Sequence, residues 1–476
     1  MAQHVETFEF PAGLEWVNTI QVPSAESLRG RVTLLYFWTY DSVHCVNLLA
    51  DLAWLENRYH DGLCIVGVHT PRYSGQRTAA AVLKAVNRHQ LRHPVASDPN
   101  YLLWQRFGVQ AWPSVVLLDT QGHAVAIFTG EGQRQEIDRR ITGLLDDAIA
   151  QDTRVYEAWP AVGRPEPRLP LAFPARVVAT ADHLYIADTG HHRVLETTLD
   201  GRIQRQFGAG NAGYWDGRLI DCGLSSPQGL ALGKDSLYIA DTGNHAIRRV
   251  RLLSGEVETV AGTGKAGRDR PNLHPDPTAV GLCAPVDLVL LNEHLYFSLA
   301  GQHQIWDLEL TRRTLDILAG SGRFGIDDGA GAYASFAQPA GLASLGQALV
   351  VADAGAGAIR AIRLADRKVT TVIGAGPWEF GDAQGSRDTA RLQHPQGVAT
   401  DPRGLVFVAD SYNSKLKAIN LKSGETRSFS LPYRFHEPEG VSLSQNALWI
   451  ANTNAHEIVR VDLANSGSCQ RIAVGE

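Results

Sequence analysis

Sulfur-containing residues are scarce in this sequence. Its 476 residues include five cysteines and one methionine. The cysteines are widely spaced and no Cys-x-x-Cys pair occurs, which excludes a zinc site of standard spacing and gives no sign of a disulfide framework. Isolated cysteines are typical of a protein in a reducing compartment.

Long apolar runs are also missing. The N-terminal segment has no basic region followed by an apolar stretch, and no later segment has the length of a membrane span. A secretory signal peptide and a membrane-spanning segment are therefore not expected. We expect a soluble, cytoplasmic protein without a membrane partner.

Positive charge is not in excess. The chain carries 44 lysines and arginines against 50 aspartates and glutamates, which gives a net charge of −6 at pH 7. This balance excludes a global attraction to nucleic acid, so no nucleic-acid partner is expected. The local basic clusters are short, and we interpret them as solvated edges of outer strands. They are Arg248-Arg249-Val250-Arg251, Arg312-Arg313 and Lys415-Leu416-Lys417.

One short phrase recurs six times in the C-terminal two thirds of the chain. Each copy is a β-rich run closed in most cases by a turn former, and the closing residues are 53, 58, 54, 57 and 42 positions apart. A period near fifty indicates repeated supersecondary units. The copies are Leu184–Asp188, Leu237–Asp241, Leu295–Leu299, Leu349–Asp353, Val406–Asp410 and Leu448–Asn452.

Shorter alternating runs surround each copy and supply about four strands per repeat, as a propeller blade requires. The segment Ala240–Arg248, which reads Ala-Asp-Thr-Gly-Asn-His-Ala-Ile-Arg, resembles the NHL family of β-propellers. The resemblance implies an all-β, six-bladed propeller over residues 173–476, with a face that binds protein partners. The third copy departs from the pattern because Leu299 replaces the usual aspartate. The last segment, Cys469–Val474, either completes the last blade or pairs with the segment around Arg176–Val178.

Glycine-rich stretches and turn histidines accompany the repeats. Gly262-Thr-Gly264-Lys-Ala-Gly267 and its equivalents are not followed by a helical pattern, so we interpret them as loops between blades and expect no nucleotide cofactor. The turn histidines His192, His245, His303 and His456 are interpreted as side chains that bond local backbone. A resemblance to other six-bladed propellers permits a weaker alternative, a hydrolase or lyase with metal in the central channel, for which the sequence offers no ligand ring.

The first 150 residues alternate between buried strands and helices. Runs at 31–38, 64–68 and 115–118 are expected to be strands, and segments 42–59, 76–88 and 134–149 are expected to be helices. This order indicates an α/β layer fold with a partly parallel sheet. We place this domain at residues 1–152 and a proline-rich, semi-rigid linker at 153–172.

The N-terminal domain resembles thioredoxins at three places. Phe37-Trp38-Thr39-Tyr40 leads from a strand into a helix, Gly108–Ser114 contains Pro113 where the family has a cis-proline, and Asp119–Gly122 forms the hairpin turn that follows. The order of a thioredoxin-like domain followed by six NHL repeats resembles, over nearly the whole chain, a family of proteins that combine these two units.

The position of the thioredoxin active site lacks the dithiol motif. The sequence there is Asp41-Ser42-Val43-His44-Cys45, so Ser42 stands where the attacking cysteine would be and only Cys45 remains. A hydroxyl cannot replace a thiolate in disulfide exchange without a base to activate it. Dithiol oxidoreductase activity is therefore not expected.

Three interpretations of Cys45 stay open. The first is an inert, half-buried thiol. The second is a single-cysteine redox group or oxidant sensor whose environment is shaped by Asp41 and Ser42. The third is a ligand of a metal that Asp41 and His44 also bind, although the spacing of these residues is not a standard metal-site spacing. Pro113, near the same site, is interpreted as a residue that maintains the fold and surface shape and not as a catalytic residue. The sequence favours an interaction scaffold over a one-cysteine redox protein. It predicts no metal or other cofactor.

Overall fold

The computed structural model describes residues 8–160, 169–271, 273–464 and 467–475. The chain divides into two compact units, with the division between residues 167 and 168. The segment 161–168, which falls within the linker expected at 153–172, lies outside the described residues. The two units are described separately below.

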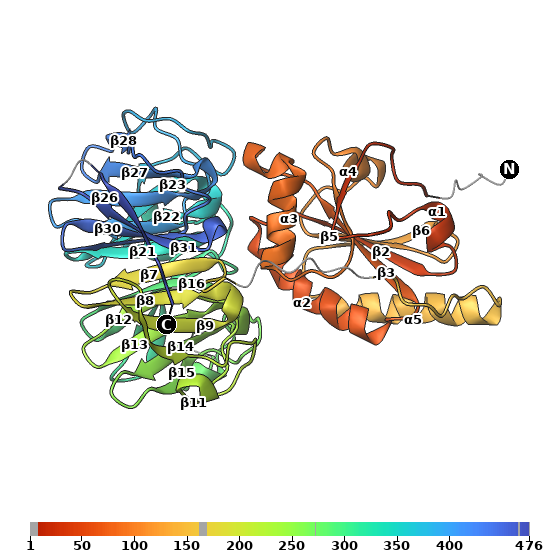
Figure 1. The fold of residues 1–476 in the computed structure, drawn as a ribbon, viewed down its shortest axis with the longest axis horizontal. Coiled ribbons are helices and arrows are strands. Elements are labelled where there is room, and N and C mark those ends of the chain that lie inside the picture. Colours follow the sequence, from red (N-terminus) through yellow and green to blue (C-terminus); the bar gives the residue numbers. More distant parts are fainter. Residues whose placement is uncertain (1–7, 161–168, 272, 465–466, 476) are drawn as a thin grey trace. The chain divides into compact units, whose positions relative to one another are not determined.

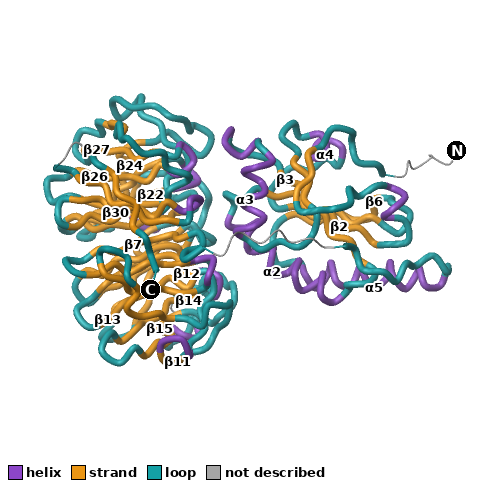
Figure 2. The backbone as a smooth tube through the Cα atoms, in the orientation of Figure 1, coloured by secondary structure: helices purple, strands orange, loops and turns teal. Residues whose placement is uncertain are grey.

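The first unit is a six-stranded sheet flanked by helices (Figures 1 and 2). Strands β2, β3 and β4 are parallel, and β1, β5 and β6 are antiparallel to their neighbours in the order β1-β4-β3-β2-β5-β6. The strands are β1 (Glu15–Val17), β2 (Val32–Trp38), β3 (Leu63–His69), β4 (Val95–Ser97), β5 (Ser114–Leu118) and β6 (Ala124–Thr129).

The helices are α1 (Ala25–Leu28), α2 (Val43–Arg58), α3 (Ala79–Arg88), α4 (Leu102–Arg106) and α5 (Arg134–Ala150). α2, α3 and α5 pack on the face of the sheet that carries Leu34 and Tyr36, while α1 and α4 pack on the face that carries Leu35 and Phe37. All seven residues of β2 are buried, because both of its faces are covered. This burial on both faces explains why the strand is a nearly continuous apolar run and does not alternate apolar with polar residues.

One predicted helix begins later than expected. The segment Ser74–Arg77 forms a separate 3-10 helix, η1, and α3 starts after Thr78, whose side chain accepts a hydrogen bond from the Ala81 backbone N–H. The prediction of a helix from residue 76 was wrong because Thr78 supplies a helix cap inside the predicted range.

The second unit is a six-bladed propeller, as predicted. Each blade is an antiparallel sheet formed by one continuous segment of chain, and blades 2 and 4 gain a short fifth strand. The first three blades contain β7 (Pro174–Ala179), β8 (His183–Asp188), β9 (Arg193–Thr198) and β10 (Ile203–Phe207); β12 (Pro227–Leu232), β13 (Ser236–Asp241), β14 (Ala246–Arg251) and β15 (Glu256–Ala261) with β11 (Gly217–Arg218); and β16 (Pro285–Leu291), β17 (His294–Leu299), β18 (Gln304–Glu309) and β19 (Thr314–Ala319).

Blades 4 to 6 follow the same plan. They contain β21 (Pro339–Leu345), β22 (Ala348–Asp353), β23 (Ala358–Arg363) and β24 (Lys368–Ile373) with β20 (Gly329–Ala330); β25 (Gly397–Thr400), β26 (Leu405–Asp410), β27 (Lys415–Asn420) and β28 (Thr426–Ser428); and β29 (Gly440–Ser444), β30 (Ala447–Asn452), β31 (Glu457–Asp462) and β32 (Cys469–Ile472).

The ring closes without sharing a blade between the two ends of the propeller. β32 pairs with β31 and is the fourth strand of blade 6, which decides between the two alternatives left by the sequence. Blade 6 then contacts blade 1 through side chains and a backbone bridge. Thr453 Oγ1 donates to the Pro174 carbonyl over 2.8 Å, and Gly475 exchanges backbone bonds with Gly201 and Ile203.

The residue that closes the repeated phrase holds the loop before its blade in five of the six blades. In blades 1, 2, 4 and 5 the aspartate Oδ1 accepts a bond of 2.6–2.7 Å from a backbone N–H sixteen or seventeen positions earlier. In blade 6 the amide oxygen of Asn452 accepts the equivalent bond from His436. These aspartates are fully buried, so the interpretation of them as structural residues is confirmed.

A buried cation balances the aspartate in three of the blades. Arg248, Arg360 and Lys417 each lie seven positions after the aspartate, are completely buried, and also bond a second aspartate from the preceding loop. The interpretation of the basic clusters as solvated strand edges was therefore wrong for Arg248 and Lys417. The three sets are Asp216–Arg248–Asp241, Asp328–Arg360–Asp353 and Asp382–Lys417–Asp410.

The turn histidines connect neighbouring blades. Nδ1 of His192, His245, His303 and His456 accepts a hydrogen bond of 3.0–3.2 Å from a backbone N–H that leads into the next blade. The expectation that they bond local backbone was wrong, because their left-handed backbone turns each ring toward the adjacent blade. In the third blade, where Leu299 replaces aspartate, the Gln302 side chain accepts the loop N–H of Cys283.

Removal of one buried cation should destabilise the propeller. Burial raises the pKa of Asp353 to about 7, and the positive charge of Arg360 opposes that rise. Arg360→Met leaves a buried carboxyl group without its cation, so we expect a loss of about 3–5 kcal/mol in the free energy of unfolding. Urea unfolding of the full chain measures the change. Arg363→Met, on the exposed end of the same strand, is the control and should leave the midpoint unchanged; equal shifts for both variants would contradict the role of the buried pair.

Candidate functional site

Ser42 and Cys45 lie at the start of α2, directly after β2. Ser42 is the N-cap residue, and its Oγ accepts a hydrogen bond from the Cys45 backbone N–H over 3.4 Å. Serine satisfies an unpaired helix N–H in this position. The hydroxyl therefore has a structural partner.

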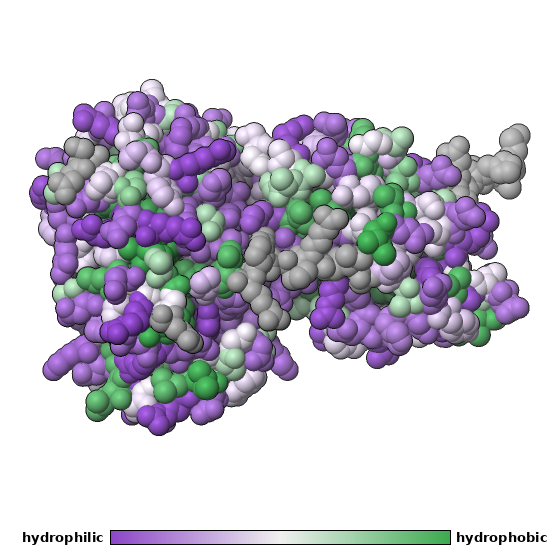
Figure 3. Space-filling model, in the orientation of Figure 1, coloured by the Kyte–Doolittle hydropathy of each residue, from purple (hydrophilic) through white to green (hydrophobic). Residues whose placement is uncertain are grey.

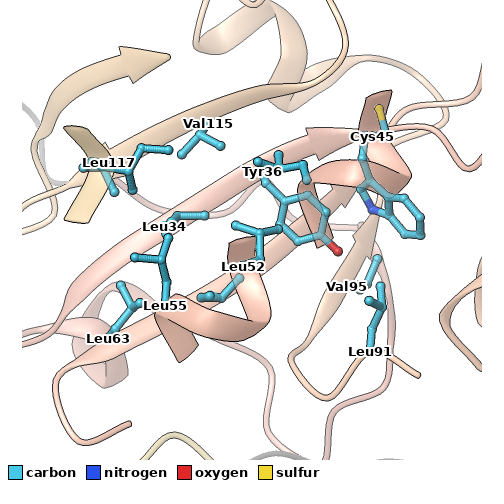
Figure 4. Close-up of a cluster of buried hydrophobic side chains, with 14 of the residues drawn as sticks. Leu34, Tyr36, Cys45, Leu52, Leu55, Leu63, Leu91, Val95, Val115 and Leu117 are labelled. Atoms are coloured by element: carbon cyan, nitrogen blue, oxygen red, sulfur yellow. The ribbon is translucent and has the colours of Figure 1, made fainter. Parts of the chain in front are cut away.

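The Cys45 side chain is fully buried in the core of the first unit. Figure 4 shows it in the cluster that also contains Tyr36, Leu52 and Val95. Burial raises the pKa of the Cys45 thiol to about 12, and the negative charges of Asp41 and Glu131 add to the rise; hydrogen bonds from Thr39 and Ser42 oppose it only in part. A thiol in this environment is protonated at neutral pH and is a poor nucleophile.

Asp41 anchors the loop before α2 to the η1 segment. Its carboxylate accepts hydrogen bonds from Thr39 Oγ1 and from Gln76 Nε2, the latter over 2.8 Å, and lies 3.5 Å from the Arg72 guanidinium. The side-chain amide oxygen of Gln76, Oε1, in turn accepts hydrogen bonds from the backbone N–H groups of Arg72 and Tyr73. We call Thr39, Asp41, Arg72 and Gln76 the Asp41 cluster.

His44 and Pro113 lie beside the same helix end in the fold but have separate roles. His44 Nδ1 is 3.1 Å from Glu131 Oε1, whose other oxygen accepts a bond from Asn47. The Trp112–Pro113 peptide bond is cis, as the resemblance implied. Trp112 Nε1 donates to Thr70 Oγ1 over 2.7 Å.

The metal hypothesis gains no support from this geometry. Asp41 bonds the Asp41 cluster, His44 bonds Glu131, and Cys45 is enclosed in the core. Among the residues that the structure describes, no group of three or more histidine, cysteine, aspartate and glutamate side chains could hold a metal ion. None of the five cysteines, all of them described, forms a disulfide bond, and four of them are buried.

Sequence reasoning missed His69, which ends β3 opposite Trp38 in the parallel register. Its ring is fully buried, stacks on Tyr40 at 5.2 Å, and has no hydrogen-bond partner in the described part of the chain. Burial lowers its pKa to about 4, so the ring is neutral at pH 7. The predicted strand at 64–68 ended one residue before His69, so the sequence gave no sign that this histidine would be enclosed.

The central channel of the propeller is closed by a buried ion pair. Arg176, from the inner strand of blade 1, contacts Asp287 Oδ2 of blade 3 over 3.1 Å and donates to the carbonyls of Gln396 and Glu439. Asp287 also accepts the Leu342 N–H of blade 4. Above this pair lies a cavity of about 310 Å³ that the inner strands of all six blades line, mainly with aliphatic side chains. The alternative of a metal-dependent enzyme in the channel has no ligand set here.

Comparisons with known proteins connect the two units. A thioredoxin-like family model matches residues 30–124, and an NHL repeat model matches residues 392–419. NHL repeat-containing protein 2 from Homo sapiens is 34% identical over 97% of this chain and 70% of its own length. The chain belongs to the NHL repeat-containing protein 2 family.

Other known proteins are similar to this family member over different shares of its length. Protein SUPPRESSOR OF QUENCHING 1, chloroplastic, from Arabidopsis thaliana is 32% identical over 98% of this chain and 47% of its own length. Thiol-disulfide oxidoreductase YkuV from Bacillus subtilis is 21% identical over 27% of this chain and 87% of its own. A solved nidogen/laminin complex is similar with a TM-score of 0.43, covering 61% of this chain and 92% of that chain at 14% identity.

The described part of this NHL repeat-containing protein 2 relative contains no helix with the length and apolar character that a membrane crossing requires.

The Asp41 cluster should stabilise the first unit. Gln76→Leu removes the amide that bonds the buried Asp41 carboxylate and leaves two backbone N–H groups without their acceptor, so we expect a loss of about 2–4 kcal/mol. Gln105→Leu, at an exposed position of α4, is the control and should change the free energy of unfolding by less than about 0.5 kcal/mol. Chemical unfolding of the full chain compares them. A Gln76→Leu protein as stable as the control would show that the cluster contributes nothing.

Proposed function

We propose that this protein is an interaction scaffold: the propeller presents a binding face to protein partners, and the thioredoxin-like unit is a second docking surface that carries out no thiol exchange. The observation that supports this most strongly is the complete burial of Cys45, with its pKa raised to about 12. Neighbouring Ser42 caps the helix, and His44 bonds Glu131. We propose that Ser42 stands in place of the attacking cysteine and that Cys45 is a packing residue.

The loops between blades are the proposed binding face. In a propeller the connections from the fourth strand to the next blade leave from the same end as the turns between the second and third strands. Tyr333 and Trp378 lie in two of these connections and are 79% and 69% exposed. Aromatic residues are enriched in protein interfaces. Figure 3 draws one side of the molecule, on which hydrophilic residues predominate and apolar residues are scattered.

We also propose that the protein works in a reducing compartment such as the cytoplasm. The support is that none of the five cysteines, all of them described, forms a disulfide bond and that four of them are buried. A plant relative carries the word chloroplastic in its name, which describes that protein.

Partner recovery distinguishes the scaffold from the one-cysteine alternative. Full-length protein carrying Tyr333→Ala and Trp378→Ala should recover its partners at a reduced level, because two large exposed rings are lost from the loop face. Cys45→Ser should leave recovery unchanged. Leu253→Ala is the control, since Leu253 is fully exposed in the turn between β14 and β15, at the opposite end of the blade.

Quantitative mass spectrometry of affinity-purified protein gives the comparison. The scaffold proposal fails if Cys45→Ser abolishes recovery of partners that a reductant also releases from the unsubstituted protein. That result would establish the single-cysteine redox function instead.

A further inference from the structure

A second cavity of the propeller lies where blade 5 connects to blade 6. Its volume of about 670 Å³ is within the range of about 300–1,000 Å³ that small-ligand sites occupy. One wall is the start of β27 with the turn before it, and the other wall is the connection between the blades. The lining residues are Asn413, Ser414, Lys415, Leu416, Phe429, Ser430, Leu431, Tyr433, Arg434, Phe435 and His436.

The cavity exists because the outer strand of blade 5 is short. β28 has three residues, whereas the outer strands β15, β19 and β24 have six. After β28 the Phe429 N–H bonds the Leu416 carbonyl, and the chain then continues as the second wall. The side of β27 next to Lys415 and Leu416 is thereby left uncovered by a regular strand.

The lining carries positive charge and no carboxylate. Lys415, Arg434 and His436 are exposed residues of the wall, and no aspartate or glutamate is among the lining residues. Within the described ranges, the Arg434 guanidinium and the His436 imidazole have neither a hydrogen bond nor an ion pair. The Arg434 guanidinium and the His436 imidazole, which can both donate hydrogen bonds, therefore belong to the cavity lining and have no acceptor among the described residues.

Neighbouring carboxylates have their own donors. Asp382 bonds Lys415 and Lys417, Glu457 accepts from Asn452 and Tyr433 and pairs with Arg471, and Glu437 accepts from Asn454. Lys415 is partly neutralised by Asp382, but the charge of Arg434 is not balanced by these groups.

The remaining wall is aromatic and aliphatic. The rings of Tyr433 and Phe435 lie 5.3 Å apart, and Phe429 and Leu431 belong to the same lining. A guanidinium group binds carboxylate and phosphate groups through paired N–H bonds. We propose that this cavity binds an anionic group, carboxylate or phosphate, carried on an aromatic or apolar body, with Arg434 and His436 as its principal contacts.

The cavity lies at the end of the blades proposed above to recruit partners, but the ligand site does not depend on that proposal. Binding of a small anion is measurable without any partner protein. Failure of one proposal therefore leaves the other standing.

Saturation-transfer difference NMR on the full chain tests the site with three probes that share a phenyl ring: phenyl phosphate, phenylacetate and the neutral phenylacetamide. We expect transfer to at least one anion and none to the amide. The double substitution Arg434→Gln and His436→Gln should weaken binding about tenfold or more, because charge-assisted bonds are lost. Arg427→Gln, at an 80% exposed arginine of adjacent β28 outside the cavity, is the matched control and should bind as the unsubstituted protein does.

The relative affinity of the two anions identifies the natural headgroup as phosphate or carboxylate. Equal transfer to phenylacetamide, no transfer to either anion, or undiminished binding by the double variant would each overturn the proposal. Circular dichroism of each variant shows that the comparison is between folded proteins, and a fold is expected because Arg434 makes no contact that the structure requires.

Discussion

The buried aspartate that ends the second strand in four of the six blades is the constraint on which most of the propeller depends. It accepts the N–H of the loop that arrives from the previous blade, so it connects neighbouring blades as well as its own strands. A buried carboxylate is costly unless it is paired. Three blades meet this cost with an arginine or lysine at a fixed position, whereas Asn452 in blade 6 is uncharged and Val459 occupies the place of the cation. In blade 1 Leu195 occupies that place, and Arg193, five positions after Asp188, supplies the cation instead.

In the thioredoxin-like unit, the polar residues at the start of α2 also stabilise the structure. Asp41 and Ser42 bond neighbouring donors, and Cys45 fills the core between the sheet and α2. Each of these groups has a hydrogen-bond partner or an enclosed environment. The region has kept the shape of a thioredoxin, including the cis bond before Pro113, while its polar side chains stabilise the loop.

The fold was predictable because it is repetitive and strongly patterned. The recurring phrase set the number of blades, and the continuous apolar run of β2 marked a strand covered on both faces. Burial of single polar residues was not predictable. Arg248 and Lys417 lie in strands that carry other basic residues, as surface residues do. Their burial is favourable because each pairs with the aspartate seven residues earlier and with a loop aspartate, Asp216 or Asp382, that the fold brings close. His69 and the Arg176–Asp287 pair likewise depend on contacts between distant segments. At the candidate site the sequence predicted that Ser42 stands in place of a cysteine, but the complete burial of Cys45 became visible only in the packed core.

The central claim is that Cys45 is a packing residue and has no redox function. The pH dependence of its alkylation, followed peptide by peptide with mass spectrometry in the native full chain, tests this most directly. The account predicts slow labelling of Cys45 from pH 6 to pH 10, with the half-buried Cys469 labelled faster and Cys45 reacting readily only after unfolding. A labelling midpoint below the value of about 8.5 for an unperturbed thiol would contradict the account.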